Sequence, residues 1–195
     1  MLKDKFANEI TIINDDVLRI SEDKISSQKL TVFGNLPYNI STEILSKWII
    51  NINKNFWFES LVLMFQKEVA ERIIAESNTS KYGRLSILSN WKLNVTKIID
   101  IKPQSFSPRP KIDSTLLLFT PRKNFFKLKE AKNLEMITRI FFSQRRKMLK
   151  KPFNQVFNNA RHVAKKFDIN LNLRPQNLEP EVYFKLVEEY EALRC

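Results

Sequence analysis

The sequence predicts an α/β fold with a small all-helical region at its C-terminal end. Short apolar runs typical of strands alternate with segments in which apolar residues repeat at helical spacing. The run at residues 61–65 is apolar at every position, as is typical of a strand covered on both faces of a sheet. Because strands and helices alternate along the chain, we expect a mainly parallel sheet.

Five strands are predicted, at residues 10–13, 30–33, 61–65, 95–101 and 115–120. Three apolar stripes between them predict helices: the first contains Ile44, Leu45, Trp48, Ile49 and Ile52, the second Val69, Ala70, Ile73 and Ile74, and the third Leu85, Leu88 and Trp91. Residues 102–114 contain three prolines and are predicted to form a stiff, extended connection between the last two strands.

The pattern changes around residues 123–133, where strand-like runs give way to helical ones, so we place a domain boundary there: residues 1–125 form the α/β domain and residues 126–195 a helical domain. One helix of the second domain is predicted from Leu134, Ile137, Ile140, Phe141 and Met148. The last helix is predicted to begin at Pro180 and to bury Val182, Tyr183, Leu186, Val187 and Tyr190.

The strongest candidate site is the turn Asn35-Leu36-Pro37-Tyr38, which follows an apolar strand and precedes a helix that is predicted to begin at Ser41 or Thr42. Open α/β sheets bind ligands at this edge. An aromatic ring can stack on a flat base, while an amide oxygen and a backbone carbonyl can accept hydrogen bonds from an exocyclic amine. Such acceptors can rotate the amine lone pair of adenine out of conjugation. No strong general base is required, because the proton can leave after the new bond forms. The same tetrapeptide also occurs as an ordinary turn without a function.

The formal net charge of +12 favours an anionic partner. Between Met136 and Phe167 there are nine Lys or Arg residues and no Asp or Glu. Two interpretations remain for this segment, a phosphate-binding surface and a solvated helix face.

Other classes of site find little support. The single cysteine, Cys195, and the single histidine, His162, form no disulfide framework or metal site, and we expect no metal. No run of 18 apolar residues and no signal-peptide pattern is present, so we expect a cytoplasmic protein.

Five ordered motifs resemble the ribosomal RNA adenine dimethyltransferases, the KsgA-type enzymes that use S-adenosylmethionine. They lie at residues 35–42, 65–72, 82–86, 106–114 and 142–147. The resemblance covers nearly the whole chain and implies a Rossmann-like methyltransferase sheet with a small C-terminal helical domain. It also implies that the substrate is RNA of the immature small ribosomal subunit, without a membrane partner, and we expect a monomer.

The resemblance assigns roles by position. Asn35 and the Leu36 carbonyl, with Pro37 in the same motif, would accept hydrogen bonds from the target amine. Tyr38 would stack on one face of a flipped adenine and Phe106 on the other. Without the resemblance, the favoured interpretation of Phe106 is a residue that fills the core.

Cofactor and RNA contacts are also implied. Asp16 matches the acidic residue that contacts the adenine ring of S-adenosylmethionine, with Asp15 an adjacent candidate, and Asn35 is included in the cofactor site. From the same loop as Phe106 we expect Arg109 and Lys111 to lie near the RNA, and from the basic helical segment we expect RNA contacts by Arg139, Arg145, Arg146 and Lys147.

The sequence departs from the family at its start. The family has a Gly-rich loop after its first strand and an acidic residue after its second, but this chain has only two glycines, Gly34 and Gly83. Residues 1–6 resemble the end of the helix before the third strand, so we expect the first two strands to be absent and S-adenosylmethionine to bind weakly or not at all.

Two alternative functions remain. One is a non-catalytic ribosomal-RNA-binding or ribosome-assembly protein. The other is a methyltransferase of the macrolide-resistance type, which modifies large-subunit RNA; residues 144–147 favour the small-subunit group.

Overall fold

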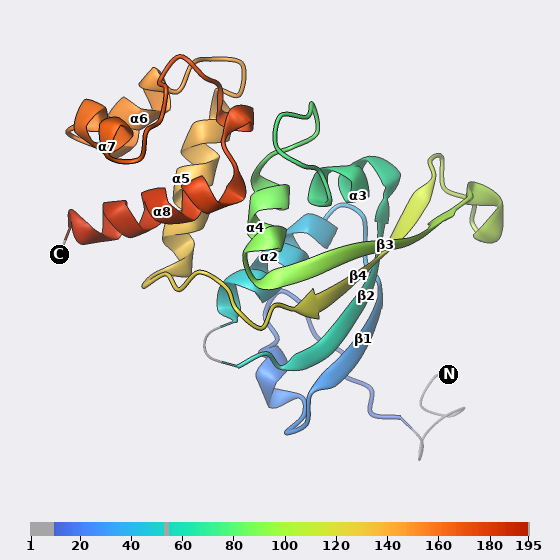
Figure 1. The fold of residues 1–195 in the computed structure, drawn as a ribbon. Helices are drawn as coiled ribbons and strands as arrows, with labels where there is room; N and C mark the ends of the chain where they lie inside the picture. Colours follow the sequence, from blue (N-terminus) through green and yellow to red (C-terminus); the bar gives the residue numbers. More distant parts are fainter. Residues whose placement is uncertain (1–9, 53–54, 195) are drawn as a thin grey trace.

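The computed structural model describes residues 10–52 and 55–194 (Figure 1). Four strands form one sheet: β1 (Leu30–Asn35), β2 (Phe58–Gln66), β3 (Leu93–Ile101) and β4 (Ser114–Pro121). The helices between them are α2 (Ser41–Asn51), α3 (Lys67–Ile73) and α4 (Arg84–Lys92), with short 3-10 turns η1 (Glu22–Lys24) and η2 (Pro103–Ser105). These elements confirm the predicted α/β class and four of the five predicted strands.

The predicted strand at residues 10–13 is wrong. These residues are not in a strand, and Ile10 and Ile13 are 47% and 52% exposed. A strand needs a partner for its backbone groups, and none of the four described strands pairs with this segment. Residues 1–6, predicted as a helix end, lie outside the described part of the chain.

The prediction of a mainly parallel sheet is also wrong. The strand order is β1-β2-β4-β3, and only β1 and β2 are parallel; β4 runs antiparallel to both neighbours. Parallel pairing requires a long crossover, usually a helix. The connection from β3 to β4 contains only η2 and a Pro-rich loop, so the chain turns back and β4 inserts beside β2.

One face of the sheet carries the hydrophobic core. Alternate residues Leu61, Leu63 and Phe65 of β2 are fully buried, together with Ile44 of α2 and Ile87 of α4. On the edge strand β1, Phe33 is 78% exposed. Since side chains alternate between faces along a strand, the helices cover the face opposite to Phe33.

Buried Lys92 connects α4 to the end of α2. Its Nζ donates to the carbonyls of Ile49 (3.1 Å) and Ile52 (2.6 Å) and lies 3.8 Å from the centroid of the Trp91 ring. These carbonyls belong to the last turn of α2 and its C-cap, where intrahelical donors are missing. Burial lowers the pKa of Lys92 to about 8.

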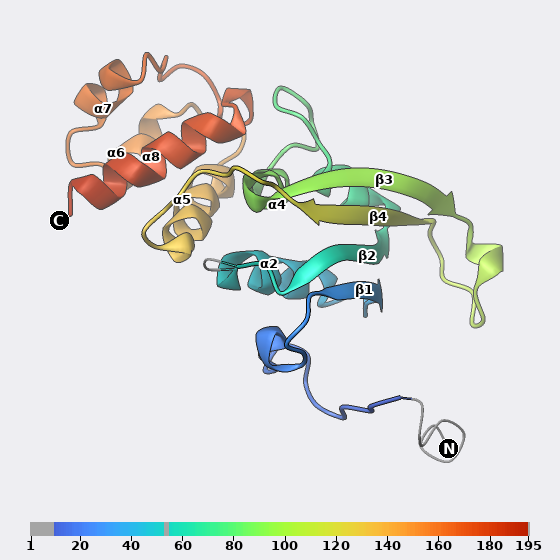
Figure 2. The same ribbon diagram turned by 60° about the horizontal axis from the view of Figure 1, so that its bottom comes forward.

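The C-terminal region contains α5 (Ala131–Ser143), α6 (Lys150–Val156), α7 (Ala160–Lys166), the turn η3 (Pro175–Asn177) and α8 (Pro180–Ala192). Figures 1 and 2 show this group at one end of the sheet, next to α4. The start of α8 at Pro180 is confirmed. Met148 does not belong to the α5 helix as predicted, because α5 ends at Ser143 and Met148 is 56% exposed.

The helical region shares its core with the α/β part. Trp91 Nε1 of α4 donates to the Phe126 carbonyl at 2.7 Å, and the Phe126 ring lies 6.0 Å from that of Phe184 in α8. The predicted boundary near residue 125 thus falls in a connection that is packed on both sides. No helix in residues 10–52 and 55–194 is long and apolar enough to span a membrane.

Candidate active site

The Asn35 turn lies at the carboxyl edge of the parallel pair. Asn35 is the last residue of β1 and is in register with Met64, while Gln66 at the end of β2 is in register with Ser114. This register brings the Asn35 turn and the end of the β3–β4 connection to the same edge of the sheet.

Gly34 allows the strand to enter this turn. A Cβ at this position would come within 2.7 Å of Leu63 Cδ2 and 3.2 Å of Leu36 Cδ2. Leu63 is fully buried, so it has little room to move. A residue without a Cβ is therefore needed at this position, because β1 lies close to the core side chain Leu63.

Two acceptors of the turn have no hydrogen-bond partner among the described residues. The Pro37 carbonyl accepts from Ile40 N at 3.1 Å, and the Tyr38 carbonyl accepts from Ser41 Oγ at 3.2 Å. In the described part of the chain, no hydrogen bond is made to the Asn35 side chain or to the Leu36 carbonyl. Both are the acceptors that recognition of an amine requires.

Tyr38 is connected to the predicted Phe106 loop through Ser114. The hydroxyls of half-buried Tyr38 and fully buried Ser114 are 2.7 Å apart. Ser114 directly follows residues 102–113, the loop that contains half-buried Phe106. Neither ring is part of the described hydrophobic core or pairs with another described aromatic ring, so the structure does not support the core-filling interpretation of Phe106.

Ion pairs close the base of this loop. Lys102 Nζ lies 2.8 Å from Asp113 Oδ2, and Lys67 N donates to the Asp113 carbonyl at 3.0 Å. Asp113 raises the pKa of Lys102. Lys67 Nζ also lies 3.5 Å from Asp100 Oδ2. Hydrogen bonds from Lys97 and Thr115 lower the pKa of Asp100 to about 2.

The two candidate cofactor residues before β1 are exposed and take part in local turns. Asp16 Oδ1 accepts from Leu18 N at 2.9 Å and Oδ2 lies 3.5 Å from Arg19 Nε, while Asp15 Oδ1 accepts from Asp16 N at 2.7 Å. These contacts are typical of an Asx turn. The role of Asp16 in cofactor binding stays a prediction.

The predicted RNA contacts divide into two kinds. Five are exposed to solvent: Arg109, Lys111, Arg139, Arg146 and Lys147. Arg145 is half-buried instead, and donates through Nε to Gln176 Oε1 and through Nη2 to the Thr79 carbonyl, each at 3.1 Å. Its contacts are thus structural ones, between the α3–α4 loop and the C-terminal region.

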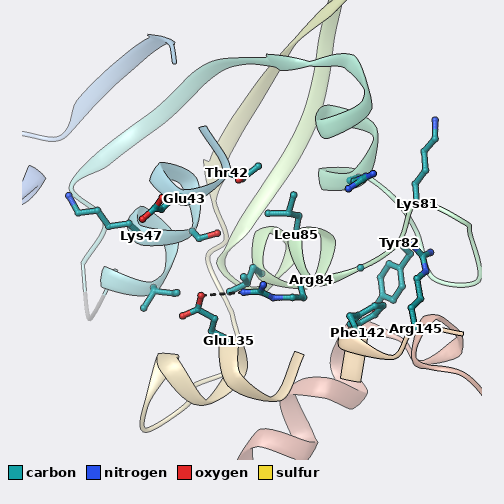
Figure 3. A pocket seen from close by; sticks show the side chains of 15 residues that line it. Thr42, Glu43, Lys47, Lys81, Tyr82, Arg84, Leu85, Glu135, Phe142 and Arg145 are labelled. Atoms are coloured by element: carbon teal, nitrogen blue, oxygen red, sulfur yellow. Dashed lines mark hydrogen bonds and ion pairs between the residues drawn. The ribbon is translucent and has the colours of Figure 1, made fainter. Parts of the chain in front are cut away.

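Sequence reasoning missed a cavity of about 800 Å³ between α2, α4 and α5 (Figure 3). Its lining comes from segments far apart in the chain: Thr42, Glu43, Ser46, Lys47, Ile50, Arg72, Lys81, Tyr82, Gly83, Arg84, Leu85, Leu88, Glu135, Phe142 and Arg145. The motif at residues 82–86 was noted only as part of the family resemblance. The described residues contain no cluster of acidic, His or Cys side chains fit for a metal.

The family Ribosomal RNA adenine dimethylase matches residues 1–192. The chain is 79% identical over 194 residues to Ribosomal RNA small subunit methyltransferase A of Pelagibacter ubique (strain HTCC1062), covering 100% of this chain and 74% of that protein. It is 41% identical to the protein of the same name from Wolbachia sp. subsp. Drosophila simulans (strain wRi), covering 94% of this chain and 66% of that protein.

Solved structures agree with the fold. A dimethyladenosine transferase from Plasmodium falciparum aligns with a TM-score of 0.73 and 26% identity, over 95% of this chain and 74% of that one. The 23S rRNA methyltransferase ErmE aligns with a TM-score of 0.63 over 97% of this chain and 76% of that one, and at 17% identity it supports the fold alone. The Rossmann-like methyltransferase fold is thereby confirmed, and the chain belongs to the ribosomal RNA adenine dimethylase family.

Proposed function

We propose that this protein dimethylates the exocyclic amine of adenine in small-subunit ribosomal RNA, with S-adenosylmethionine as the methyl donor and with a role in ribosome maturation. The observation that supports this best is the pair of free acceptors, Asn35 and the Leu36 carbonyl, next to Tyr38. Family membership and the names of the relatives support the same reaction. The predicted cytoplasmic location and monomeric state are part of this proposal.

The residues of the turn would act by positioning. The Asn35 Oδ1 and Leu36 carbonyl oxygens would each accept one N–H of the amine and orient its lone pair. Tyr38 and Phe106 would stack on opposite faces of the base, each worth about 1–3 kcal/mol. This would offset the few kcal/mol that removing a base from its stack costs. The proton leaves after the new bond forms, so the site needs no strong base.

Affinity for the RNA would come from exposed cations. Arg109 and Lys111 lie on the Phe106 loop, while Arg139, Arg146 and Lys147 lie on or after α5. Contacts of this kind supply binding that decreases with rising salt. Because Arg145 is held by Gln176 and Thr79, we assign it a supporting role in positioning Arg146 and Lys147 for RNA.

S-adenosylmethionine would supply the methyl group. This chain contains residues for only part of the cofactor's binding site. Asn35 lies at the correct edge of the sheet, and Asp16 is an exposed acid that could bind the cofactor's adenine. The two glycines are used elsewhere, Gly34 inside β1 and Gly83 at the N-cap of α4. No Gly-rich loop is therefore available within this sequence to approach the cofactor.

A non-catalytic role in ribosome assembly is the second candidate, because the cofactor contacts in this chain are incomplete. The large-subunit alternative is not favoured, since the two relatives that are 79% and 41% identical to this chain are small-subunit enzymes by name. Titration calorimetry with S-adenosylmethionine separates the two remaining candidates for the chain as it stands. Micromolar binding supports the enzymatic role and overturns the expectation of weak binding that the missing Gly-rich loop gives, whereas no detectable binding favours the non-catalytic role.

The base slot can be tested without the cofactor. An RNA hairpin with 2-aminopurine in its loop reports stacking by fluorescence quenching, and anisotropy of a labelled RNA reports total affinity. Tyr38→Ala and Phe106→Ala should each reduce the quenching and leave total affinity nearly unchanged. Phe33→Ala, which removes an exposed ring from strand β1, should change neither. A collapse of total affinity in Tyr38→Ala would show that Tyr38 is mainly structural.

A further inference from the structure

We propose that Asp113 is a positioning residue for the base slot, because it fixes the β3–β4 loop that carries Phe106. This inference rests on the proposed function, in which the rings of Phe106 and Tyr38 form the two walls of the slot. Asp113 acts through the loop and does not contact the base. Its role is to hold the Phe106 ring at the spacing from Tyr38 that stacking on both faces of a base requires.

The loop that carries Phe106, residues 102–113, is attached to the sheet at its base. Figures 1 and 2 show this loop extending beyond the end of the sheet, opposite to the helical C-terminal region. The last pair of the β3–β4 ladder is Ile101 and Ser114. Beyond this pair no ladder hydrogen bonds fix the direction of the loop, so this direction depends on contacts made next to the pair.

Asp113 makes contacts of this kind with both ends of the loop base. Its carboxylate accepts from Lys102 Nζ at 2.8 Å, which joins the last residue of the loop to the first. Its carbonyl accepts from Lys67 N at 3.0 Å, and Lys67 Nζ lies 4.0 Å from Asp113 Oδ2. The Asp113 side chain is 24% exposed, so its carboxylate is partly shielded from water and holds these cations more strongly than a fully exposed one. Asp113 therefore ties the loop to its own start and to the start of α3.

The position of Lys102 is passed to Phe106 through the short turn η2. Ser105 N donates to the Lys102 carbonyl at 3.0 Å, and Phe106 N donates to the Pro103 carbonyl at 3.2 Å. Pro103 also has a φ that its ring fixes. Little backbone freedom therefore remains between the Asp113 contact and the residue that carries the ring.

The other wall of the slot is held by the residue next to Asp113. Ser114 is fully buried, and its hydroxyl lies 2.7 Å from that of Tyr38. Asp113 and Ser114 thus act on one wall each. Because they are consecutive residues, their separation is set by covalent geometry. A base gains stacking on both faces only while both rings keep their places, so losing the Asp113 contact should remove the contribution of Phe106.

The Lys102–Asp113 pair is suited to positioning more than to global stability. Lys102 is 68% exposed, and ion pairs with an exposed partner contribute little to the free energy of unfolding. Lys97 and Asp100 form a pair of the same length, 2.8 Å, within β3 and before the loop begins. Lys97 therefore offers a matched control for Lys102.

The experiment uses the full chain and the hairpin with 2-aminopurine in its loop, at saturating protein. Lys102→Gln and Asp113→Asn should each lose about half of the quenching, the share of one of two stacking faces. Asp113→Glu keeps the carboxylate and should restore most of it. Lys97→Gln removes the same charge as Lys102→Gln and should keep full quenching. Asp168→Asn, at an exposed position after α7, controls for the effect of the lost carboxylate on total affinity.

The Phe106→Ala background provides the decisive comparison. If Asp113 acts through Phe106, Asp113→Asn reduces the quenching no further in that background. A further reduction there overturns the positioning role. So does a lower free energy of unfolding, measured in denaturant, with quenching unchanged, which is the signature of a structural contact alone.

Lys102→Gln changes an exposed side chain, so it supplies the test even where Asp113→Asn does not fold. Full quenching in Lys102→Gln overturns the positioning role and leaves the proposed function intact. If the unaltered protein binds the hairpin without quenching it, both the positioning role and the base slot are overturned.

Discussion

The hydroxyls of Tyr38 and Ser114 lie 2.7 Å apart and join the first and last segments of the candidate site. Tyr38 belongs to the turn after β1, and Ser114 begins β4, 76 residues later in the sequence. Because Ser114 is fully buried, its position is fixed by the sheet. The phenol of Tyr38 is therefore held in one place before any base arrives, which reduces the ordering cost of binding.

A double-mutant cycle measures this link. Tyr38→Phe and Ser114→Ala each remove one hydroxyl, and each should lower the unfolding free energy by about 1 kcal/mol. The double variant should lose less than the sum, since the same hydrogen bond is removed by either change. Denaturant unfolding of the four proteins gives the coupling energy. Additive losses would mean that the two hydroxyls do not interact in solution.

Gly34 predicts a steric effect on stability. In Gly34→Ala, the new Cβ would lie 2.7 Å from Leu63 Cδ2, so a fully buried side chain must move. We expect a loss of about 1–3 kcal/mol in the free energy of unfolding, as is typical of overpacking. Gly83→Ala is the matched control, because the nearest atom to its Cβ is Phe142 Cδ1 at 3.8 Å. Equal losses in the two variants, measured by denaturant unfolding, would contradict the steric argument.

Most of the fold could be predicted because its signals are local. The apolar runs of β1 to β4 and the stripe of α8 are visible in sequence windows of a few residues. The direction of β4 is not a local property, since it depends on its insertion between β2 and β3. The run at residues 10–13 has the composition of a strand, but composition does not supply a partner strand.

The candidate site likewise has one part that local sequence predicts and another part that depends on tertiary structure. The turn at Asn35 is a contiguous motif and was identified from the sequence, whereas the cavity that Arg84 lines is assembled from α2, α3, α4 and α5. Arg145 was predicted to contact RNA because it stands in a basic run. Which member of such a run faces inward depends on tertiary neighbours such as Gln176, which lies 31 residues away.

Arg145 predicts a change in local dynamics. The α3–α4 loop is held to the C-terminal region by Arg145, by Asn78 N donating to the Gln176 carbonyl at 2.8 Å, and by Asn177 Nδ2 donating to Asn78 Oδ1 at 2.9 Å. Arg145→Ala removes the hydrogen bond from Nη2 to the Thr79 carbonyl of the loop, and with it the bond to Gln176 that orients the guanidinium. Amide hydrogen exchange around Asn78 should therefore become faster.

Arg146→Ala is the control for this change, because Arg146 is exposed and adjacent in sequence. It should leave exchange at Asn78 unaltered and weaken RNA binding, with a smaller salt slope. Faster exchange at Asn78 in both variants would show that the whole segment, and not the Arg145 contacts, stabilises the loop.

Lys92 predicts a specific pH dependence of stability. Its pKa in the folded protein is lowered by burial to about 8, against 10.5 for an unburied lysine. Between these two values the unfolded chain binds more protons than the folded one, so the unfolding free energy gains a term that increases with pH. Below about pH 8 both states are protonated, and the full cost of the buried charge is present.

Lys92→Met isolates this term, because methionine keeps the apolar stem and has no titrating group. The unfolding free energy of the unaltered protein, measured in urea from pH 7 upward, should rise relative to that of Lys92→Met until the pH approaches 10.5. Lys123→Met removes an exposed lysine and should give a curve parallel to that of the unaltered protein. A parallel curve for Lys92→Met as well would mean that Lys92 stays charged throughout this range, stabilised by the Ile49 and Ile52 carbonyls and the Trp91 ring.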